Sequence, residues 1–207
     1  PEPATNVVAV TFYRSYLTAA DTAPIDQLIQ TLRDRGFAAV GLFAPSLKDE
    51  TGRTFLHDAL AHLRPTAIIN ATAFSGRGGD GTSPLDGTGC PVFQVALSTA
   101  RRKDWDTSER GLSPADLAMH VVLPEVDGRI FTGVVSFKAP DKKDPHLQYS
   151  RFAHRAEMDR IEAVVDRLEG WHRLARTPVQ DRKLALVLST YPGRADQIAH
   201  AVGLDAL

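Results

Sequence analysis

Short apolar runs alternate with amphipathic segments through the first hundred residues of the chain. Four of these runs have the length of buried strands, namely 7–12, 38–44, 66–73 and 91–97, and the first is rich in β-branched residues. Between them, residues 24–37 and 53–63 place their apolar side chains at helical spacing. Apolar strands joined by amphipathic helices are typical of a parallel sheet that is covered on both faces. We therefore expect a small doubly wound, flavodoxin-like α/β domain over residues 1–110.

The hydrophobic pattern changes after residue 110. The segment 111–150 is expected to begin with a short helix, since Ser113 is a good cap and Pro114 suits the first helical position. A Pro-Glu-Val-Asp-Gly turn should follow, and then a strand at 130–138. The rest of this mixed segment, 139–150, is polar and twice interrupted by proline, which indicates a surface loop.

The C-terminal part combines a long helix with the start of another unit. Residues 151–176 repeat apolar side chains at helical spacing, so 151–183 is expected to be mainly a connecting helix. An apolar run at 184–189 and the helical pattern behind it predict a β-α unit over 184–207. One strand and one helix cannot bury themselves, so this unit either joins the first sheet or opens a further α/β domain of a longer polypeptide. We favour the longer polypeptide.

Composition narrows the range of partners. The chain has 207 residues, of which 24 are basic and 25 acidic, and a net charge of -1 offers no general attraction to nucleic acid or to an anionic membrane. A single cysteine, Cys90, excludes an intrachain disulfide and fits a reducing compartment. No stretch has the length of a membrane span, and the first residues lack the features of a signal peptide. We expect a cytoplasmic protein with no nucleic-acid or membrane partner.

The residues that follow the predicted strands are the first candidates for a binding site. In doubly wound sheets, ligands bind at the carboxyl ends of the strands. Tyr13 and Arg14 follow the first strand, whereas Thr72 and Phe74 stand at the end of the third. This aromatic, hydroxylated and basic rim suits a flat organic ligand with carboxylate or amide arms better than a bare metal ion. The alternative is that these are ordinary polar loop tips.

The run GLSPADLAMHVVLPEVDGRI, residues 111–130, combines a histidine with two acids. Glu125 and Asp127 flank one valine, so an extended backbone would point both carboxylates to one face, with Gly128 free to adopt a positive φ. His120 precedes them by a few residues. The alternative is a solvated turn in which Asp127 caps its own backbone.

Several other motifs lack the context that their chemistry requires. Residues 76–81 match the Gly-x-Gly-x-x-Gly spacing, but no helix follows to bind a pyrophosphate. No Gly-x-x-x-x-Gly-Lys-[Ser/Thr] occurs, so nothing indicates that the chain itself binds ATP. His154, His172 and His200 are read as lone helical histidines, because a metal site needs convergent partners.

Five segments together resemble the large subunit of aerobic cobaltochelatase, the CobN type, a relative of the magnesium chelatase large subunit: 22–26, 69–75, 111–130, 135–138 and 184–194. The resemblance keeps the order of the motifs and spans nearly the whole chain. It implies an internal piece of a much longer subunit that binds a tetrapyrrole, hydrogenobyrinic acid a,c-diamide, in aerobic cobalamin biosynthesis. It also implies that cobalt is a substrate ion and that separate AAA+-type ATPase and accessory chelatase subunits hydrolyse ATP.

Metal insertion gives the acidic residues a chemical role under this resemblance. Protons must leave the ring nitrogens and water must leave the ion, and a carboxylate can act as proton acceptor and as transient oxygen ligand. Glu125 is the first candidate for both roles, including that of metal ligand. Asp127 would raise the proton affinity of Glu125 in a shared dry cleft, and His120 would serve as a second base or ligand.

The remaining candidates would bind the macrocycle. Arg14, Arg129 and Lys138 would pair with its carboxylate arms, while Tyr13 and Phe74 would stack on its face beside Thr72. The alternatives are a non-catalytic tetrapyrrole-binding or scaffold module, a piece of a magnesium chelatase, and a flavodoxin-like domain with an unrelated ligand. The chain alone is not expected to insert cobalt, because it lacks the ATPase partners.

Overall fold

The computed structural model describes residues 6–141, 143–185 and 187. The chain divides into two units, residues 1–172 and 173–207. The elements of the first unit are, in chain order, β1 (Val7–Tyr13), α1 (Arg14–Thr18), α2 (Ala23–Asp34), β2 (Ala38–Ala44), α3 (Glu50–Leu63), β3 (Ala67–Asn70), β4 (Val92–Leu97), α4 (Arg102–Asp106), α5 (Pro114–Leu117), the π-helical turn η1 (Ala118–Val122), α6 (Leu123–Val126), β5 (Ile130–Pro140), β6 (Phe152–Ala156) and most of α7 (Met158–Arg176). The described part of the second unit holds the end of α7 and the 3₁₀ turn η2 (Val179–Asp181).

Six strands form one sheet in the order β2-β1-β3-β4-β5-β6. The first five are parallel, and β6 is antiparallel to β5 at the edge. This order is that of a flavodoxin-like doubly wound sheet, so the predicted α/β fold class is confirmed. The sheet does not stop at residue 110, since β5 pairs directly with β4.

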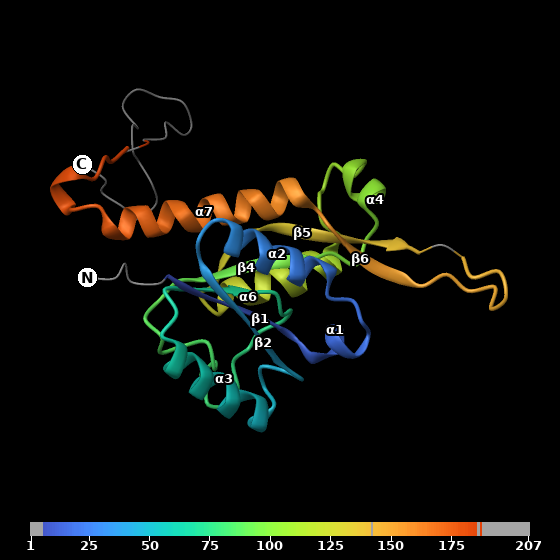
Figure 1. Ribbon diagram of the computed structural model, residues 1–207, viewed down its shortest axis with the longest axis horizontal. Coiled ribbons are helices and arrows are strands. Elements are labelled where there is room, and N and C mark those ends of the chain that lie inside the picture. The colour runs from blue at the N-terminus through green and yellow to red at the C-terminus, as the bar shows by residue number, and fades with distance from the viewer. Residues whose placement is uncertain (1–5, 142, 186, 188–207) are drawn as a thin grey trace, which may run out of the picture. The chain divides into compact units, whose positions relative to one another are not determined.

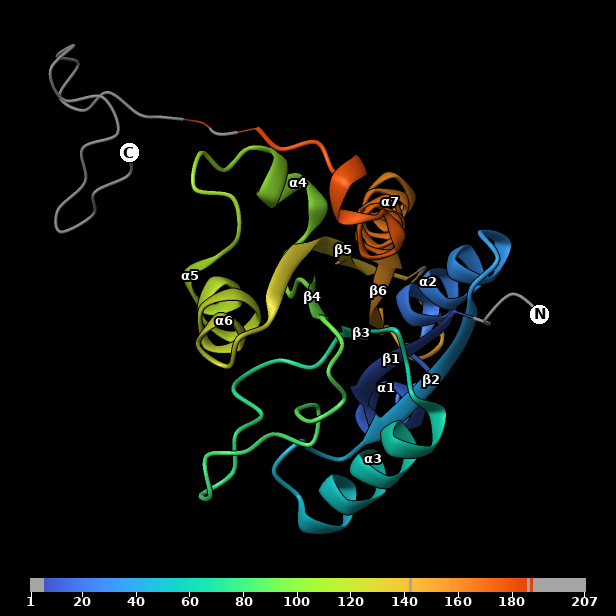
Figure 2. The ribbon, with the colours of Figure 1, turned by 90° about the vertical axis from the view of Figure 1, so that its left-hand side faces the viewer.

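Helices cover both faces of the sheet. Leu28 and Leu32 of α2 and Val165 and Leu168 of α7 are buried in one apolar cluster against β1, β3 and β4. Residues of α3 form a second cluster with the opposite faces of β1, β2 and β3. Figure 2 shows α2 and α7 on one side of the strands, with α3 and α6 on the other. The strands and helices predicted from the spacing of apolar residues therefore form two apolar clusters, one on each face of the sheet.

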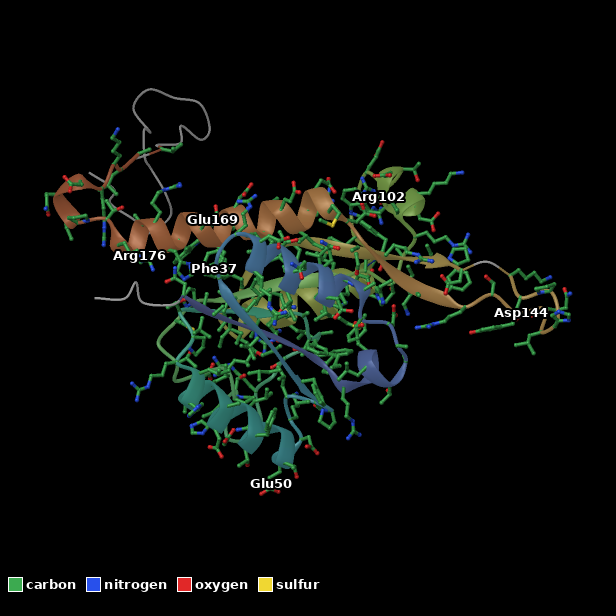
Figure 3. All side chains as sticks on the ribbon, viewed as in Figure 1. Phe37, Glu50, Arg102, Asp144, Glu169 and Arg176 are labelled. Carbon is green, nitrogen blue, oxygen red and sulfur yellow. The ribbon has the colours of Figure 1, made fainter. Side chains whose placement is uncertain are left out.

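Helix α7 contributes aromatic contacts as well as its aliphatic stripe. Trp171 meets Phe93 of β4 at 5.6 Å between ring centroids, and His172 meets Phe37 at 5.2 Å. Phe37, at the end of the turn between α2 and β2, lies close to α7 in Figure 3. At the start of α7, Glu157 forms an ion pair with Arg102 of α4.

The structure differs from the sequence expectation between residues 139 and 157. The predicted helix from residue 151 begins instead at Met158, because 152–156 pairs with β5 as the strand β6 (Figure 1). The loop predicted from residue 139 begins only after Pro140, where β5 ends. Asp144 lies near its tip (Figure 3) and accepts hydrogen bonds from the backbone N–H groups of His146 and Leu147. Strand β6 is fixed from outside its own segment, since Asp21 accepts a hydrogen bond from the backbone N–H of His154 at 2.8 Å.

The predicted β-α unit at 184–207 lies outside the described residues, apart from Leu184, Ala185 and Val187. Among the residues that the structure describes, no helix combines the length and the apolar character needed to cross a membrane.

Candidate functional site

A pocket of about 320 Å³ lies at the carboxyl edge of the sheet. The segments that line it are α1 and the residues after it, the ends of β3, β4 and β5, the turn η1, and β6. This is the edge at which doubly wound sheets bind ligands. Three of the predicted site residues line the pocket, namely Phe74, His120 and Lys138.

The helix that carries His120 is fixed at its start. Ser113 caps it by accepting a hydrogen bond from the backbone N–H of Asp116 at 3.1 Å, as the Ser-Pro pair predicted. The side chain of Asp116 is fully buried and accepts hydrogen bonds from Ser98 Oγ at 2.7 Å and from Thr99 N and Oγ1 at 3.0 and 2.9 Å. Asp116 therefore ties the helix to the end of β4. Sequence reasoning did not single out Asp116 as a site residue, because its partners Ser98 and Thr99 are distant in the sequence.

The π-helical turn η1 follows this anchored start. Such turns are rare, occur mostly as single extra residues within α-helices, and are frequent at functional sites. Met119 and His120 lie in η1, and both line the pocket. The carbonyl of Met119 accepts a 2.7 Å hydrogen bond from the backbone N–H of Phe74. The turn thus joins the helix to the residues that follow β3.

His120 presents a neutral imidazole to the pocket. Its side chain is buried, and Nδ1 has no hydrogen-bond partner among the described residues. Burial lowers the pKa of His120, the charge of Asp116 opposes this shift, and the neighbouring His154 adds to it. At pH 7 the ring is therefore uncharged and can accept a proton or a hydrogen bond.

His154 lies across the pocket lining from His120 and was not predicted as a site residue. It is not a lone helical histidine, because it lies in β6 and its Nδ1 is 2.8 Å from Asp21 Oδ2. Burial alone would raise the pKa of Asp21, but the side-chain and backbone hydrogen bonds from His154 outweigh this and leave the pKa lowered. The pair is therefore a carboxylate with an imidazole that donates to it. Asp21 and His154 are 133 residues apart, so no local pattern could have joined them.

Aromatic and cationic groups complete the pocket. Burial, together with the charge of Asp21, raises the pKa of Tyr16 to about 12, so its hydroxyl stays protonated. Phe74 has a φ of 66° and a side chain that is about half exposed. A positive φ in a bulky residue is uncommon and is often found where function constrains the backbone. Lys138, at the end of β5, adds a cation to the lining.

Tyr13, Thr72 and Arg14 do not line this pocket. The hydroxyl of Tyr13 donates to the carbonyl of Ala73 at 2.5 Å, which holds the chain at the end of β3. Thr72 is buried and donates to Asn70 Oδ1 at 2.9 Å. Arg14 is exposed on α1. All three residues lie at the carboxyl edge of the sheet. Tyr13 and Thr72 make hydrogen bonds to residues at the end of β3 and so support the segment that lines the pocket.

The expectation that Glu125 and Asp127 share one face is wrong. Residues 123–126 are helical, not extended, and residues two apart on a helix point about 200° apart. Glu125 is exposed, whereas the carboxylate of Asp127 is buried. As predicted, Gly128 adopts a positive φ, of 83°, just after this helix.

Asp127 neither shares a face with Glu125 nor caps its own backbone, because its partners lie in the loop after β3 and at Arg129. Its carboxylate accepts hydrogen bonds from Ser75 Oγ at 2.8 Å, from the backbone N–H of Gly76 at 2.7 Å and from Arg129 Nη2 at 3.1 Å. Gly76 leaves room for this guanidinium, since a side chain there would collide with it. Asp127 and Arg129 therefore hold the loop after β3 against the start of β5, and they do not line the carboxyl-edge pocket.

Two further pockets, of about 320 and 310 Å³, lie near the amino ends of strands. One is lined by the end of α3 and residues 84–88, and the other by residues 85–92 and 127–130. Within the described ranges, no three His, Cys, Asp or Glu side chains come together as a metal site. The carboxyl-edge pocket differs from the other two in holding His120 and His154, each with a buried imidazole nitrogen that lacks a hydrogen-bond partner among the described residues.

The sequence matches the protein family described as CobN/Magnesium Chelatase over residues 1–207. It is 37% identical to the aerobic cobaltochelatase subunit CobN of Sinorhizobium sp. over 99% of this chain and 16% of that protein. The corresponding protein of Pseudomonas aeruginosa is 35% identical over 96% of this chain and 16% of its own length. A magnesium-chelatase subunit of Rhodobacter capsulatus is 29% identical over 94% of this chain and 18% of that protein.

The fold also resembles a solved structure. The catalytic subunit of cobaltochelatase from Mycobacterium tuberculosis matches with a TM-score of 0.74 and 27% identity, over 98% of this chain and 17% of that chain. The present chain therefore spans about one sixth of the length of these cobaltochelatase relatives.

Proposed function

The chain belongs to the CobN/magnesium chelatase family, and from this premise we propose that it is part of the tetrapyrrole-binding large subunit of a cobaltochelatase. In this proposal the whole subunit inserts cobalt into hydrogenobyrinic acid a,c-diamide, and separate AAA+-type subunits hydrolyse the ATP. The observation that carries the proposal is the carboxyl-edge pocket, which combines an aromatic ring, a cation and two imidazoles.

The lining suits one edge of a macrocycle with acidic arms. Phe74 offers an apolar ring for stacking, and the ammonium group of Lys138 is a partner for a carboxylate arm. Arg14, exposed near the same edge, is proposed to reach a second arm. A pocket of about 320 Å³ encloses only part of a tetrapyrrole, so other parts of the subunit must contribute the remainder.

His120 and Glu125 are proposed to act on the reaction itself. His120 is neutral and lacks a described partner at Nδ1, so it can accept a hydrogen bond or a proton from the ring inside the pocket. Glu125 is exposed on the same helix, outside the pocket, where a carboxylate can act as a transient oxygen ligand for an arriving ion. Asp127 and Arg129 are proposed to hold the pocket loop rather than to touch the substrate.

Cobalt is favoured over magnesium as the substrate ion. Identity to the cobaltochelatase relatives is higher than to the magnesium-chelatase relative, at 37% and 35% against 29%. Insertion assays with each metal, in the large subunit that carries this segment together with its ATPase partners, distinguish the two.

The binding proposal is tested by titrating that large subunit with hydrogenobyrinic acid a,c-diamide and following its visible absorption. Phe74→Ala and Lys138→Ala are each expected to weaken binding by about tenfold, which corresponds to the loss of one stacking or charged contact of about 1.4 kcal/mol. Phe55→Ala is the matched control, because Phe55 is equally exposed but lies on α3. Binding that is unchanged in both pocket variants would place the ligand elsewhere.

A further inference from the structure

Asp21 and His154 form a pair with a defined tautomer. One carboxylate oxygen of Asp21 lies 2.8 Å from His154 Nδ1, and the other accepts the backbone N–H of His154 at 2.8 Å. A carboxylate only accepts hydrogen bonds, so Nδ1 carries the proton of the ring. The lone pair of the neutral imidazole is therefore at Nε2.

His154 lines the pocket, and its ring is buried there. The side chain is only 4% exposed, and Nε2 has no hydrogen-bond partner in the part of the chain that the structure describes. Tyr16 packs edge-on against the ring at 5.6 Å between centroids, and it lines the same pocket. The carboxylate and the tyrosine together fix the orientation of a buried ring that keeps one acceptor unused.

We propose that His154, positioned by Asp21, accepts the proton that leaves a ring nitrogen of the tetrapyrrole as the metal enters; this assignment rests on the proposed function. The ring N–H bond breaks, its electron pair forms the metal–nitrogen bond, and the proton is transferred to His154 Nε2. The imidazolium that forms keeps its Nδ1–H bond to Asp21, whose negative charge stabilises it. The proton then leaves to solvent and restores the neutral ring.

The arrangement favours a proton acceptor over a metal ligand. No third His, Cys, Asp or Glu side chain completes a metal site among the described residues, and the cation Lys138 lines the same pocket. Burial disfavours the charged form of His120, which has no direct carboxylate partner that the structure describes, whereas His154 has Asp21. The two histidines interact electrostatically, so protonation of one disfavours protonation of the other.

The test uses the large subunit that carries this segment, with its ATPase partners, and separates binding from insertion. His154→Gln is expected to bind the tetrapyrrole within about twofold of wild type and to insert cobalt about 10²-fold more slowly, the usual loss of one general base. Saturating Co²⁺ is expected not to restore the rate. His57→Gln is the matched control, because His57 is exposed on α3.

Asp21→Asn tests the pair without removing the imidazole, and it decides the matter if His154→Gln does not fold. Loss of the carboxylate removes the charge that stabilises the imidazolium, so the acid limb of the insertion rate should move to lower pH, with a lower maximal rate. The charged and titratable groups around the Asp21–His154 pair are Tyr16 on α1, His120 on η1, Lys138 on β5 and Arg151 just before β6.

Three results would overturn the assignment. One is insertion at the wild-type rate by His154→Gln, another is recovery of that rate at high Co²⁺, which would make His154 a metal ligand, and the last is an unshifted pH profile in Asp21→Asn. The proposed function fails separately, by an absence of tetrapyrrole binding in the wild-type subunit.

Discussion

At the scale of single residues, Glu125 and Asp127 show how backbone conformation decides the role of a side chain. The two acids are separated by one residue, yet helix α6 leaves Glu125 in solvent and directs Asp127 into the protein. There Asp127 compensates the buried guanidinium of Arg129, whose side chain is 3% exposed. The sequence identified the two acids as candidates but did not determine the backbone conformation between them, because Pro-Glu-Val-Asp-Gly is compatible with both a turn and the end of a helix.

Because of the buried Asp127–Arg129 ion pair, substitution of Asp127 should destabilise the fold much more than substitution of the nearby Glu125. Asp127→Asn in the 207-residue chain should lower the free energy of unfolding by about 3–5 kcal/mol, because the buried guanidinium of Arg129 loses its ion-pair partner. Glu125→Gln should change it by less than about 0.5 kcal/mol. Urea unfolding of both variants at pH 7 provides the measurement. Equal effects at the two positions would show that the buried pair does not stabilise the loop.

The lowered pKa of Asp21 implies that the stability of the folded chain depends on pH. Its pKa in the folded chain is lowered, since the hydrogen bonds from His154 outweigh the cost of burial. The stabilisation is therefore present above the unfolded value, about 3.9, and is lost as the pH falls through the lower folded value. The difference in unfolding free energy between wild type and Asp21→Asn should shrink below about pH 4. Urea unfolding of both proteins between pH 3 and 7 measures this difference. A difference that stays constant over this range would show that ionised Asp21 does not stabilise the fold.

At the scale of elements, the regular parts of the fold followed from the sequence and the site-forming parts did not. Strands β1 to β4 were predicted because they are short apolar runs, β5 from its hydrophobic pattern, and the helix start at Ser113 because its cap is local. Strand β6 was missed, since its sequence, Phe-Ala-His-Arg-Ala, is mixed and its partners are β5 and Asp21. The π turn η1 has no local signal, and it lies between a helix start and an end that are both tied to distant loops.

Asp116 is predicted to hold helix α5 against the end of β4. Asp116→Ala removes three hydrogen bonds and leaves the donors of Ser98 and Thr99 without their acceptor, at a cost of about 2–4 kcal/mol in unfolding free energy. Ser113→Ala, which removes only the cap of the same helix, should cost about 1 kcal/mol.

Asp58→Ala is the control for the Asp116 variant, because Asp58 is 72% exposed on α3 and should change stability by less than about 0.5 kcal/mol. Thermal or urea unfolding of the three variants ranks them. A loss at Asp116 no greater than that at Ser113 would show that the helix is held by its cap and apolar contacts alone.

At the scale of the whole molecule, the chain is small relative to the reaction proposed for it. Its sheet carries a pocket of about 320 Å³, and its length is about 16% of that of the cobaltochelatase relatives. The sequence contains no Gly-x-x-x-x-Gly-Lys-[Ser/Thr] loop for ATP phosphates. The sequence thus predicted the fold class and the edge that carries the pocket, whereas the proposal that this edge binds a tetrapyrrole rests on the family relationship.

The 207-residue chain is predicted not to insert cobalt even with the ATPase partners present, because its pocket of about 320 Å³ encloses only part of a tetrapyrrole. The chain is mixed with hydrogenobyrinic acid a,c-diamide, Co²⁺, ATP and the ATPase partners, and the visible spectrum is followed for the conversion of the free ligand into its cobalt complex. The large subunit that carries the segment should convert the ligand under the same conditions, and circular dichroism should confirm that the short chain is folded. If the folded short chain turned over at a rate comparable with that of the large subunit, the remaining five sixths of the relatives' length would not be needed for the chemistry, and the pocket would have to enclose the reacting centre by itself.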